Sequence, residues 1–315
     1  MEKITSRAVL GELKRAMAAM GPIGWVPKIS NLFTSDQASE EYPWLSAVPA
    51  LREWVGGRNA KGFKESSIEI KNKHFEATLE ILVRDLRRDK LSILRARINE
   101  LVRRAITHPE KMLSTLILNG AASDCYDGQF FFDDDHEEGD SGAQSNDISI
   151  DISTLAVASG GATAAVMNPA QAQLCIAKAI EAIISFKDSA GEPMNTDATG
   201  FLVMVPTVLG FAFKTAIATS GQVAESQTVL DEYKREFNIE VVTNPRLTWT
   251  ANFGVFRTDS YIKPLIFQRE TGINIGAKAE GSEFEFDNDA HQYGVDYWGN
   301  CDYGLWQNAC LVTLA

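Results

Sequence analysis

The longest helical pattern in the sequence, at residues 84–118, constrains the fold more than any other stretch. Its apolar side chains recur at helix spacing, at Leu91, Leu94, Ile98, Leu101 or Val102, and Ala105. A strand-like stretch of alternating residues precedes it at 66–83, and an acidic loop follows it at 121–165. A long basic helix between two such segments is typical either of an enzyme surface or of a subunit that joins copies of itself.

Two consecutive helices are expected within this pattern. Asp89 suits the N-cap of the first helix. Pro109 should end or kink that helix just before it, because proline lacks a backbone N–H group. Thr107 and Glu110 have the spacing of a capping box, which predicts a second helix over 109–118.

Residues 57–84 are expected to form a β-hairpin. Ile68 and Ile70 alternate with polar residues, and a second alternating run follows at 75–83. The lysine-asparagine-lysine sequence at 71–73 is the expected turn. A two-stranded hairpin is marginal in water, so its apolar face needs a partner.

Residues 1–56 are interpreted as an extended arm. After a first helix, glycines and prolines interrupt the pattern between residues 21 and 27. Tyr42, Trp44 and Trp54 then lie on a stretch with little periodicity. Long irregular segments are uncommon inside compact domains, which favours packing of these aromatic side chains on a neighbouring subunit.

The region 166–250 alternates helix and strand, as in a compact α/β domain. The expected elements are a helix from Asn168 to about 190, a buried strand at 201–205, a helix from Pro206 to about 219 and a strand at 239–242. From residue 253 onward the chain has mostly short strand patterns rich in glycine and aromatic residues.

Charge is unevenly distributed along the 315 residues, which carry a net charge of -12. Residues 84–111 hold nine Lys/Arg against four Asp/Glu, whereas residues 112–177 hold ten Asp/Glu and no Lys or Arg. Blocks of opposite sign suit interaction surfaces, and two separate solvated faces are the alternative. The negative net charge argues against a free-standing nucleic-acid-binding protein.

The four cysteines have no C-x-x-C spacing, which favours a reduced intracellular chain. The charged N-terminal stretch lacks the apolar run of a signal peptide. No run of apolar residues approaches the length of a membrane span. We therefore expect no membrane partner.

The sequence contains no nucleophile, phosphate-loop or zinc motif. The densest group of oxygen ligands is the acidic run at 133–138 with Asp140, which offers donors for Ca²⁺ or Mg²⁺. Its spacing is not that of an EF-hand, so a solvated loop is favoured over a metal site or a catalytic carboxylate pair. We expect no catalytic residue, cofactor or metal.

The basic helix face suits two roles. Its arginines offer contacts to phosphates, or they pair with carboxylates of the same or a neighbouring subunit. We favour the second role, because no aromatic residues are interleaved to stack on bases. The arginines are Arg87, Arg88, Arg95, Arg97, Arg103 and Arg104.

Several short sequence segments occur together in one order. They are EYPWLSAVPALREWVGGR, IEIKNKHFEATLEI, HPEKMLSTLILNG and YDGQFFFDDDH, followed by LVMVPTVLGFAF, VVTNPRLT, KPLIFQRE and YGVDYWGNCDYGLWQNA. From about Glu40 onward this ordered set closely resembles the Mu-like phage major head subunit family. The chain departs from that family before the long helix, where an acidic stretch is expected and only Asp89 is acidic among residues 86–90.

The resemblance implies an α+β fold of the Hong-Kong-97 capsid type. It divides the chain into an N-terminal arm at 1–56, an extended β-hairpin loop at 57–85 and a peripheral domain with a spine helix at 86–149. An axial domain at 150–250 and return strands of the peripheral domain at 251–315 complete the expected division.

The implied function is that of a structural major capsid protein of a phage or prophage, which assembles into an icosahedral shell around DNA. The expected partners are the chain itself in hexamers and pentamers, scaffold or protease and portal proteins, and packaged double-stranded DNA bound without sequence specificity. The expected location is the virion, after assembly in the bacterial cytoplasm. The alternatives are an encapsulin-like compartment of the same fold and a metal-dependent hydrolase that uses the 133–140 acidic cluster.

Eleven residues are the expected assembly contacts. They are Trp44, Trp54, Phe63, Ile68, Ile70, Phe75, Leu79, Arg87, Arg88, Arg95 and Arg97.

Overall fold

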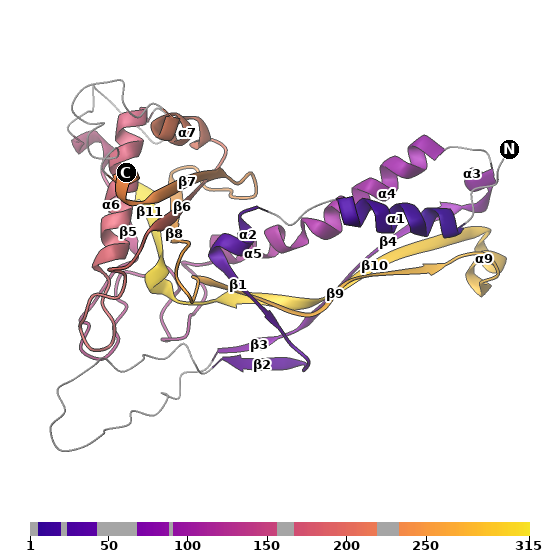
Figure 1. The fold of residues 1–315 in the computed structure, drawn as a ribbon, viewed down its shortest axis with the longest axis horizontal. Coiled ribbons are helices and arrows are strands. Elements are labelled where there is room, and N and C mark those ends of the chain that lie inside the picture. The colour runs from indigo at the N-terminus through magenta and orange to yellow at the C-terminus, as the bar shows by residue number, and fades with distance from the viewer. Residues whose placement is uncertain (1–5, 20–23, 43–67, 88–90, 156–166, 219–232) are drawn as a thin grey trace, which may run out of the picture.

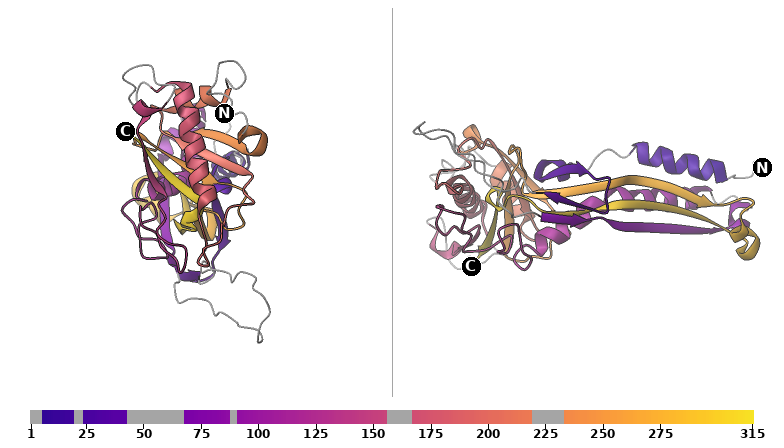
Figure 2. Two further views of the ribbon diagram at one scale, coloured as in Figure 1. Left: turned by 90° about the vertical axis from the view of Figure 1, so that its left-hand side faces the viewer. Right: turned by 90° about the horizontal axis from the view of Figure 1, so that it is seen from below.

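The computed structural model describes residues 6–19, 24–42, 68–87, 91–155, 167–218 and 233–315. An elongated four-stranded sheet, which we call the ribbon, projects with its covering helices from a body built on a five-stranded sheet (Figure 1). The view from below also shows the ribbon extending away from that body on one side (Figure 2, right). The molecule is therefore far from spherical.

The ribbon is a four-stranded sheet in the order β1-β9-β10-β4. Its strands are β1 (Ser30–Thr34), β9 (Leu265–Lys278), β10 (Ala290–Tyr303) and β4 (Lys73–Leu82). Strand β9 runs parallel to β1 and antiparallel to β10, which is antiparallel to β4. A short helix, α9 (Glu283–Asn288), lies between β9 and β10 at the far end of the ribbon.

Helices cover one face of the ribbon. Helix α1 (Ser6–Ala19) and helix α4 (Leu91–Ile106) lie side by side along it. Alternate residues of β4 face these helices, as the period of two in its sequence predicts. The fully buried part of this cluster is small: Val9, Leu13, Ile81, Leu86, Ile98, Val102 and Tyr293.

The break predicted near Pro109 is confirmed. Helix α4 ends at Ile106, and α5 (His108–Leu118) begins after Thr107 with its proline in the first turn. The predicted capping box is wrong, because the Thr107 side chain makes no capping hydrogen bond and its hydroxyl faces the carbonyl of Arg104 instead. The expected N-cap residue Asp89 lies outside the described residues, between α3 (Val83–Arg87) and α4.

The expected hairpin turn at 71–73 is wrong. Strand β3 (Ile68–Lys71) pairs with β2 (Ser39–Tyr42), whereas β4 pairs with β10. Asn72 between them donates to the carbonyl of Gln37 and accepts from Gln268, so it ties two sheets together. The observed hairpin partner of β3 is β2, and the residues between β2 and β3, 43–67, lie outside the described ones.

Within the expected arm, the described residues 6–19 and 24–42 pack on their own subunit. Helix α1 packs on α4, a short helix α2 (Val26–Ile29) packs on α5, and β1 joins the ribbon sheet. Tyr42 is buried, and its hydroxyl donates to Gln268 Oε1 at 2.7 Å. Its aromatic ring therefore packs within its own subunit.

The body is a mixed sheet in the order β5-β11-β8-β6-β7. The strands are β5 (Asp147–Ile150), β11 (Ala309–Leu314), β8 (Asn252–Arg257), β6 (Gly200–Val205) and β7 (Asn238–Thr243). Helix α6 (Pro169–Ser185) crosses the sheet, and α7 (Gly210–Ala218) packs beside α6 and β7. Every residue of β6 is buried, as its apolar sequence predicts.

The predicted helix after Asn168 is confirmed. The Asn168 side chain accepts from Gln171 N, and the Gln171 side chain accepts from Asn168 N, which completes a capping box. The helix ends at Ser185 rather than near residue 190, and the next helix begins at Gly210 rather than at Pro206.

The expected assignment of 251–315 to the peripheral domain is wrong in part. Strands β8 and β11 belong to the five-stranded sheet, where they are central and almost entirely buried. Strands β9 and β10, between them in sequence, belong to the ribbon. The chain thus leaves the body and returns to it within this region. Strand β5, which the expected division placed in the peripheral part, also lies in the body sheet.

Two 3₁₀ helices, Ile152–Thr154 and Trp306–Asn308, complete the described elements. Among the residues that the structure describes, no helix combines the length and apolar character required to cross a membrane.

Candidate functional site

The structure describes the side chains of only some of the expected contact residues. Trp44, Trp54, Phe63 and Arg88 lie outside the described residues, and so do the side chains of Arg87 and Arg95. The remaining five lie on the ribbon or at its base, and they do not form one patch.

Ile70 is buried inside its own subunit, with 1% of its surface exposed. It packs with Tyr42, Ile266 and Leu305, and the half-buried Ile68 lies against the same cluster. Ile70 therefore has no free surface for a neighbour and stabilises the base of the β2–β3 pair instead.

Phe75 and Leu79 are half-buried on the helix-facing side of β4. The ring of Phe75 lies 4.4 Å from that of His108, and Leu79 packs against the small ribbon cluster. Both residues serve the packing of the ribbon, with only part of each side chain left for a neighbour.

Arg97 is exposed on α4, and within the described part of the chain no carboxylate forms an ion pair with it. One turn further on, Glu100 accepts from both Arg103 and Arg104, each at 2.9 Å. Hydrogen bonds from Arg103 and then Arg104 lower the pKa of Glu100 to about 2. The preferred sequence reading, arginines paired with carboxylates, therefore describes Arg103 and Arg104, whereas Arg97 is free to contact another chain.

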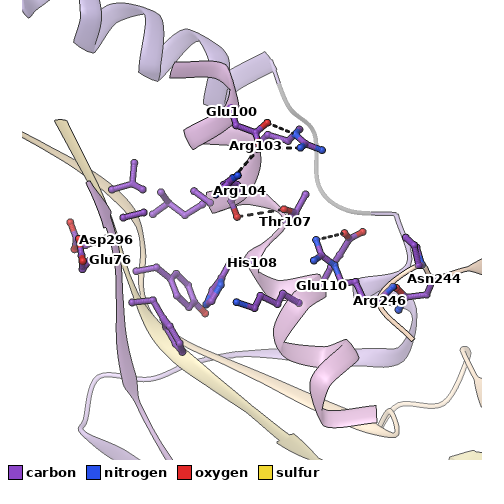
Figure 3. Close-up of a pocket in the computed structure, with 18 of the residues that line it drawn as sticks. Glu76, Glu100, Arg103, Arg104, Thr107, His108, Glu110, Asn244, Arg246 and Asp296 are labelled. Carbon is purple, nitrogen blue, oxygen red and sulfur yellow. Dashed lines mark hydrogen bonds and ion pairs between the residues drawn. The ribbon is translucent and has the colours of Figure 1, made fainter. Parts of the chain in front are cut away.

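A cleft of about 960 Å³ lies where the ribbon meets the body, between α4, α5, β4, β10 and the turn after β7 (Figure 3). His108 projects into it between the rings of Phe75 and Tyr297, at centroid distances of 4.4 and 5.9 Å. Burial, followed by the nearby charge of Lys111, lowers the pKa of His108. The imidazole is therefore held neutral at the junction.

Two interactions cross from the helix to the turn on one side of this cleft. Arg246 lies 3.9 Å from Glu110, and the buried amide of Asn244 donates to the hydroxyl of Ser114 at 2.9 Å. These polar contacts add to the apolar packing of Leu113 and Ile117 in the main core, so α5 is fixed to the body on this side of the cleft.

Hydrogen bonds within the acidic loop hold its shape, while Trp306 and Gln307 join it to the body. The side-chain amide of Gln307 donates to Glu138 at 3.1 Å. His136 Nδ1 lies 2.6 Å from Asp127 Oδ2, and the imidazole stacks on the indole of Trp306 at 4.0 Å. Burial alone would raise the pKa of Asp127, but the hydrogen bond and charge of His136 outweigh it and lower that pKa. Glu138 accepts from the hydroxyl of Tyr126, whose pKa is raised by burial and by that carboxylate. The sequence reading of a simply solvated loop missed this anchoring.

Asp133, Asp134 and Asp135 lie together at the surface of the loop, with carboxylate oxygens within 4.8 Å of one another. Asp133 accepts from the backbone N–H groups of Asp134 and Phe130, which is a turn-forming role. A cluster of exposed carboxylates of this kind is a solvated loop tip, and its arrangement gives no reason to assign it chemistry.

Three large apolar side chains that sequence reasoning missed stand free on the described surface. Tyr261 is 98% exposed, Phe286 on α9 is 90% exposed, and Phe211 at the start of α7 is 84% exposed. No pattern in the sequence separated them from core residues, since Phe286 even alternates with acidic residues as a half-buried strand residue would. Each is a candidate contact to another chain.

The family described as Mu-like prophage major head subunit gpT matches residues 10–156 and 231–313. The major capsid protein of Escherichia phage Mu is 37% identical over 109 residues, which are 35% of this chain and 36% of that protein. The Mu-like prophage FluMu major head subunit of Haemophilus influenzae is 33% identical over 112 residues, which are 36% of each chain. The chain thus aligns with about a third of the length of these two relatives.

Solved structures show the same fold. The procapsid of bacteriophage JBD30 gives a TM-score of 0.55 at 22% identity, over 98% of this chain and 75% of that chain. The capsid of Cyanophage P-SCSP1u gives a TM-score of 0.60 at 11% identity, over 94% of this chain and 90% of that one. The expected α+β capsid fold is confirmed by these structures.

The family match covers well over half of the chain, on both sides of the α6–α7 region. It includes the ribbon, the α4–α5 pair and the strands that return to the body. The chain therefore belongs to the Mu-like prophage major head subunit gpT family, a family of structural head proteins and not of enzymes.

Proposed function

We propose that this protein is the major capsid subunit of a phage or prophage head, which assembles into an icosahedral shell enclosing double-stranded DNA. Family membership over most of the chain is the observation that carries this proposal. The proposed location is the virion, and the proposed site of assembly is the cytoplasm of the bacterial host.

The shape of the subunit supports assembly. Strands β9 and β10 have 14 residues each, so the ribbon reaches roughly 45 Å from the body at about 3.3 Å per residue. Its own buried cluster is small. A thin ribbon of this kind gains stability when neighbouring subunits cover it.

The β2–β3 pair bears on the proposed contact between subunits. Tyr42 and Ile68, the described residues on either side of the segment 43–67, are paired across the two strands. This segment contains Trp44, Trp54 and Phe63, the aromatic residues expected to contact another subunit. We propose that it supplies the contact that the 57–85 hairpin was expected to make.

The proposed partners are further copies of the chain in hexamers and pentamers, with portal and scaffold or protease proteins and the packaged DNA. Each contact between copies can be modest, because the later contacts of a subunit in a closed ring are effectively intramolecular. Charged residues such as Arg97 fix the register of these contacts more than they add affinity. The net charge of -12 favours DNA that is enclosed without tight binding.

Replacing residues 43–67 by an Asn-Gly turn tests the proposal. The turn suits the antiparallel pairing of Tyr42 with Ile68, so we expect circular dichroism and thermal unfolding close to those of the parent chain. Electron microscopy should show few or no closed shells. A matched control, Trp44→Ala with Trp54→Ala, keeps the length of the segment and should show a partial loss of shells. Normal shells from the shortened chain would contradict the proposed role of the segment.

A further inference from the structure

The cleft between ribbon and body is lined by polar groups that the subunit itself leaves unpaired. Two buried side-chain atoms on its wall, His108 Nε2 and Thr243 Oγ1, have no hydrogen-bond partner among the described residues. Buried polar groups in native proteins are nearly always paired. Two such atoms on the wall of one cleft therefore indicate that something else pairs with them there.

Two cations of the same cleft keep unused donors. Within the described part of the chain, the ammonium group of Lys111 on α5 forms no hydrogen bond or ion pair. Arg246 lies 3.9 Å from Glu110, which is beyond hydrogen-bond distance, and its guanidinium group has no other partner in the described residues. Since lysine and arginine side chains only donate, these two groups need an acceptor.

The side chains that α4, α5 and the turn after β7 contribute to the cleft have an excess of positive charge. They are Arg103, Arg104, Lys111 and Arg246 against Glu100 and Glu110. Glu100 is already engaged by two of these arginines, each at 2.9 Å. The first turn of α5 also lines the cleft, and the positive end of its helix dipole acts in the same direction. The unpaired groups therefore suit an anion.

The strand side of the cleft presents aromatic rings rather than carboxylates. Glu76 and Asp296 border the cleft, but they alternate with Phe75 and Tyr297 along β4 and β10. Figure 3 shows Glu76 and Asp296 on the side of the strands away from His108. The apolar lining consists of Trp25, Phe75, Ala105, Ile273, Val295 and Tyr297. A ligand of this cleft should therefore carry an apolar body as well as a negative group.

The size of the cleft fits a small molecule. Its volume of about 960 Å³ is within the range of about 300–1,000 Å³ that is typical of small-molecule sites. We propose that the cleft binds a small organic anion with a flat apolar body. Lys111 and Arg246 hold its negative group, and the rings of Phe75 and Tyr297 contact its body.

Such a ligand would link the ribbon to the body. The rings belong to β4 and β10 of the ribbon, whereas Arg246 and Thr243 belong to β7 and the turn after it. The site lies within one subunit, so the inference goes beyond the proposed capsid function and does not rest on it.

The test uses the unassembled full-length chain and three probes, which are 2-naphthoate, its uncharged analogue 2-naphthamide, and inorganic phosphate. Isothermal titration calorimetry measures binding. We expect 2-naphthoate to bind at least about tenfold more tightly than either of the others, because it alone has both the charge and the apolar body. Equal affinity for 2-naphthamide would overturn the proposal, because the cleft would then be an apolar surface without anion recognition. Equal affinity for phosphate would show an adventitious ion only and would also overturn it.

A double variant tests the two cations. Lys111→Gln with Arg246→Gln should weaken binding of 2-naphthoate by about tenfold and change that of 2-naphthamide by less than about twofold. Both side chains are exposed, so the variant should fold. The matched control, Lys178→Gln with Lys214→Gln, removes the same charge from α6 and α7, which are not among the described elements that line the cleft. It should change affinity by less than about twofold, and equal weakening by this control would overturn the proposal.

Acetylation of lysines in the parent chain, read by mass spectrometry, gives a second measurement that needs no variant. Bound 2-naphthoate should protect Lys111 but not Lys178. An equally reactive Lys111 in the presence of saturating 2-naphthoate would overturn the proposal, because the probe would then bind elsewhere.

Shells assembled without any probe distinguish a free ligand from a neighbouring subunit. Lys111 should stay reactive in them, and its protection would show that a second copy fills the cleft, which would overturn the proposal. A failure to form shells would instead contradict the proposed function, and the probe measurements on the unassembled chain would be unchanged.

Discussion

Ile70→Ala should destabilise the subunit rather than weaken a contact between subunits. Ile70 is 1% exposed and packs against Tyr42, Ile266 and Leu305. Replacing a buried isoleucine by alanine costs about 2–5 kcal/mol, depending on how far the site collapses. This cluster is small and borders a two-stranded sheet, which can relax, so we expect a loss of about 3 kcal/mol.

Urea denaturation measures this loss, with unassembled subunits as the sample so that assembly does not add to stability. The matched control is Ile68→Ala two residues away, where the side chain is only half-buried and the expected loss is about 1 kcal/mol. If Ile70→Ala unfolded at the parent urea concentration and yet formed no shells, Ile70 would be a contact residue and the burial argument would be refuted.

Further predictions concern charge and pH. Arg257 is buried and donates to Asn195 at 2.8 Å, so Arg257→Met should cost about 3 kcal/mol in the same denaturation assay by leaving buried polar groups unpaired. Because the pKa of His108 is lowered in the folded chain, the unfolded chain takes up this proton first. Stability should therefore fall as the pH drops below about 6.5, and His108→Phe should flatten that dependence in urea midpoints measured between about pH 7 and 5. Arg97→Glu on exposed α4 should leave the urea midpoint within about 0.5 kcal/mol of the parent but reduce the yield of shells by microscopy. Calorimetry with Ca²⁺ should show no binding tighter than about millimolar, and the triple variant Asp133→Asn, Asp134→Asn and Asp135→Asn should give the same result.

Local chemistry predicted several elements correctly. Pro109 marks the break between the two long helices, and the Asn168 capping box marks the start of α6. The all-apolar stretch of β6 is a buried central strand. In each case the signal lies within a few residues of the feature, so the sequence alone carries it.

The partners of strands were not predictable from the same patterns. Alternation in β3 and β4 shows which side chains share a face, but it does not show which strand lies alongside. Asparagine is common in turns, yet the side chain of Asn72 forms hydrogen bonds with Ser35 and Gln268, which are distant in sequence. Contacts between distant segments therefore determine that β3 pairs with β2 and β4 pairs with β10.

Which apolar residues are exposed at the surface was the hardest feature to predict from the sequence. Ile70 and Phe286 are both apolar residues in short patterned stretches, but one is buried and the other is 90% exposed. Only the packing of distant segments separates them. The ordered resemblance to head subunits carried the functional inference, because no single residue in the chain specifies a reaction or a ligand.

Negative-stain electron microscopy of the purified full-length chain is the most direct test of the capsid proposal. We expect closed, roughly spherical shells of uniform diameter, together with a size-exclusion peak far larger than a 34.6 kDa subunit. A single monomeric species with no shells, over a wide range of protein and salt concentrations, would contradict the proposal that this chain builds a phage head by itself.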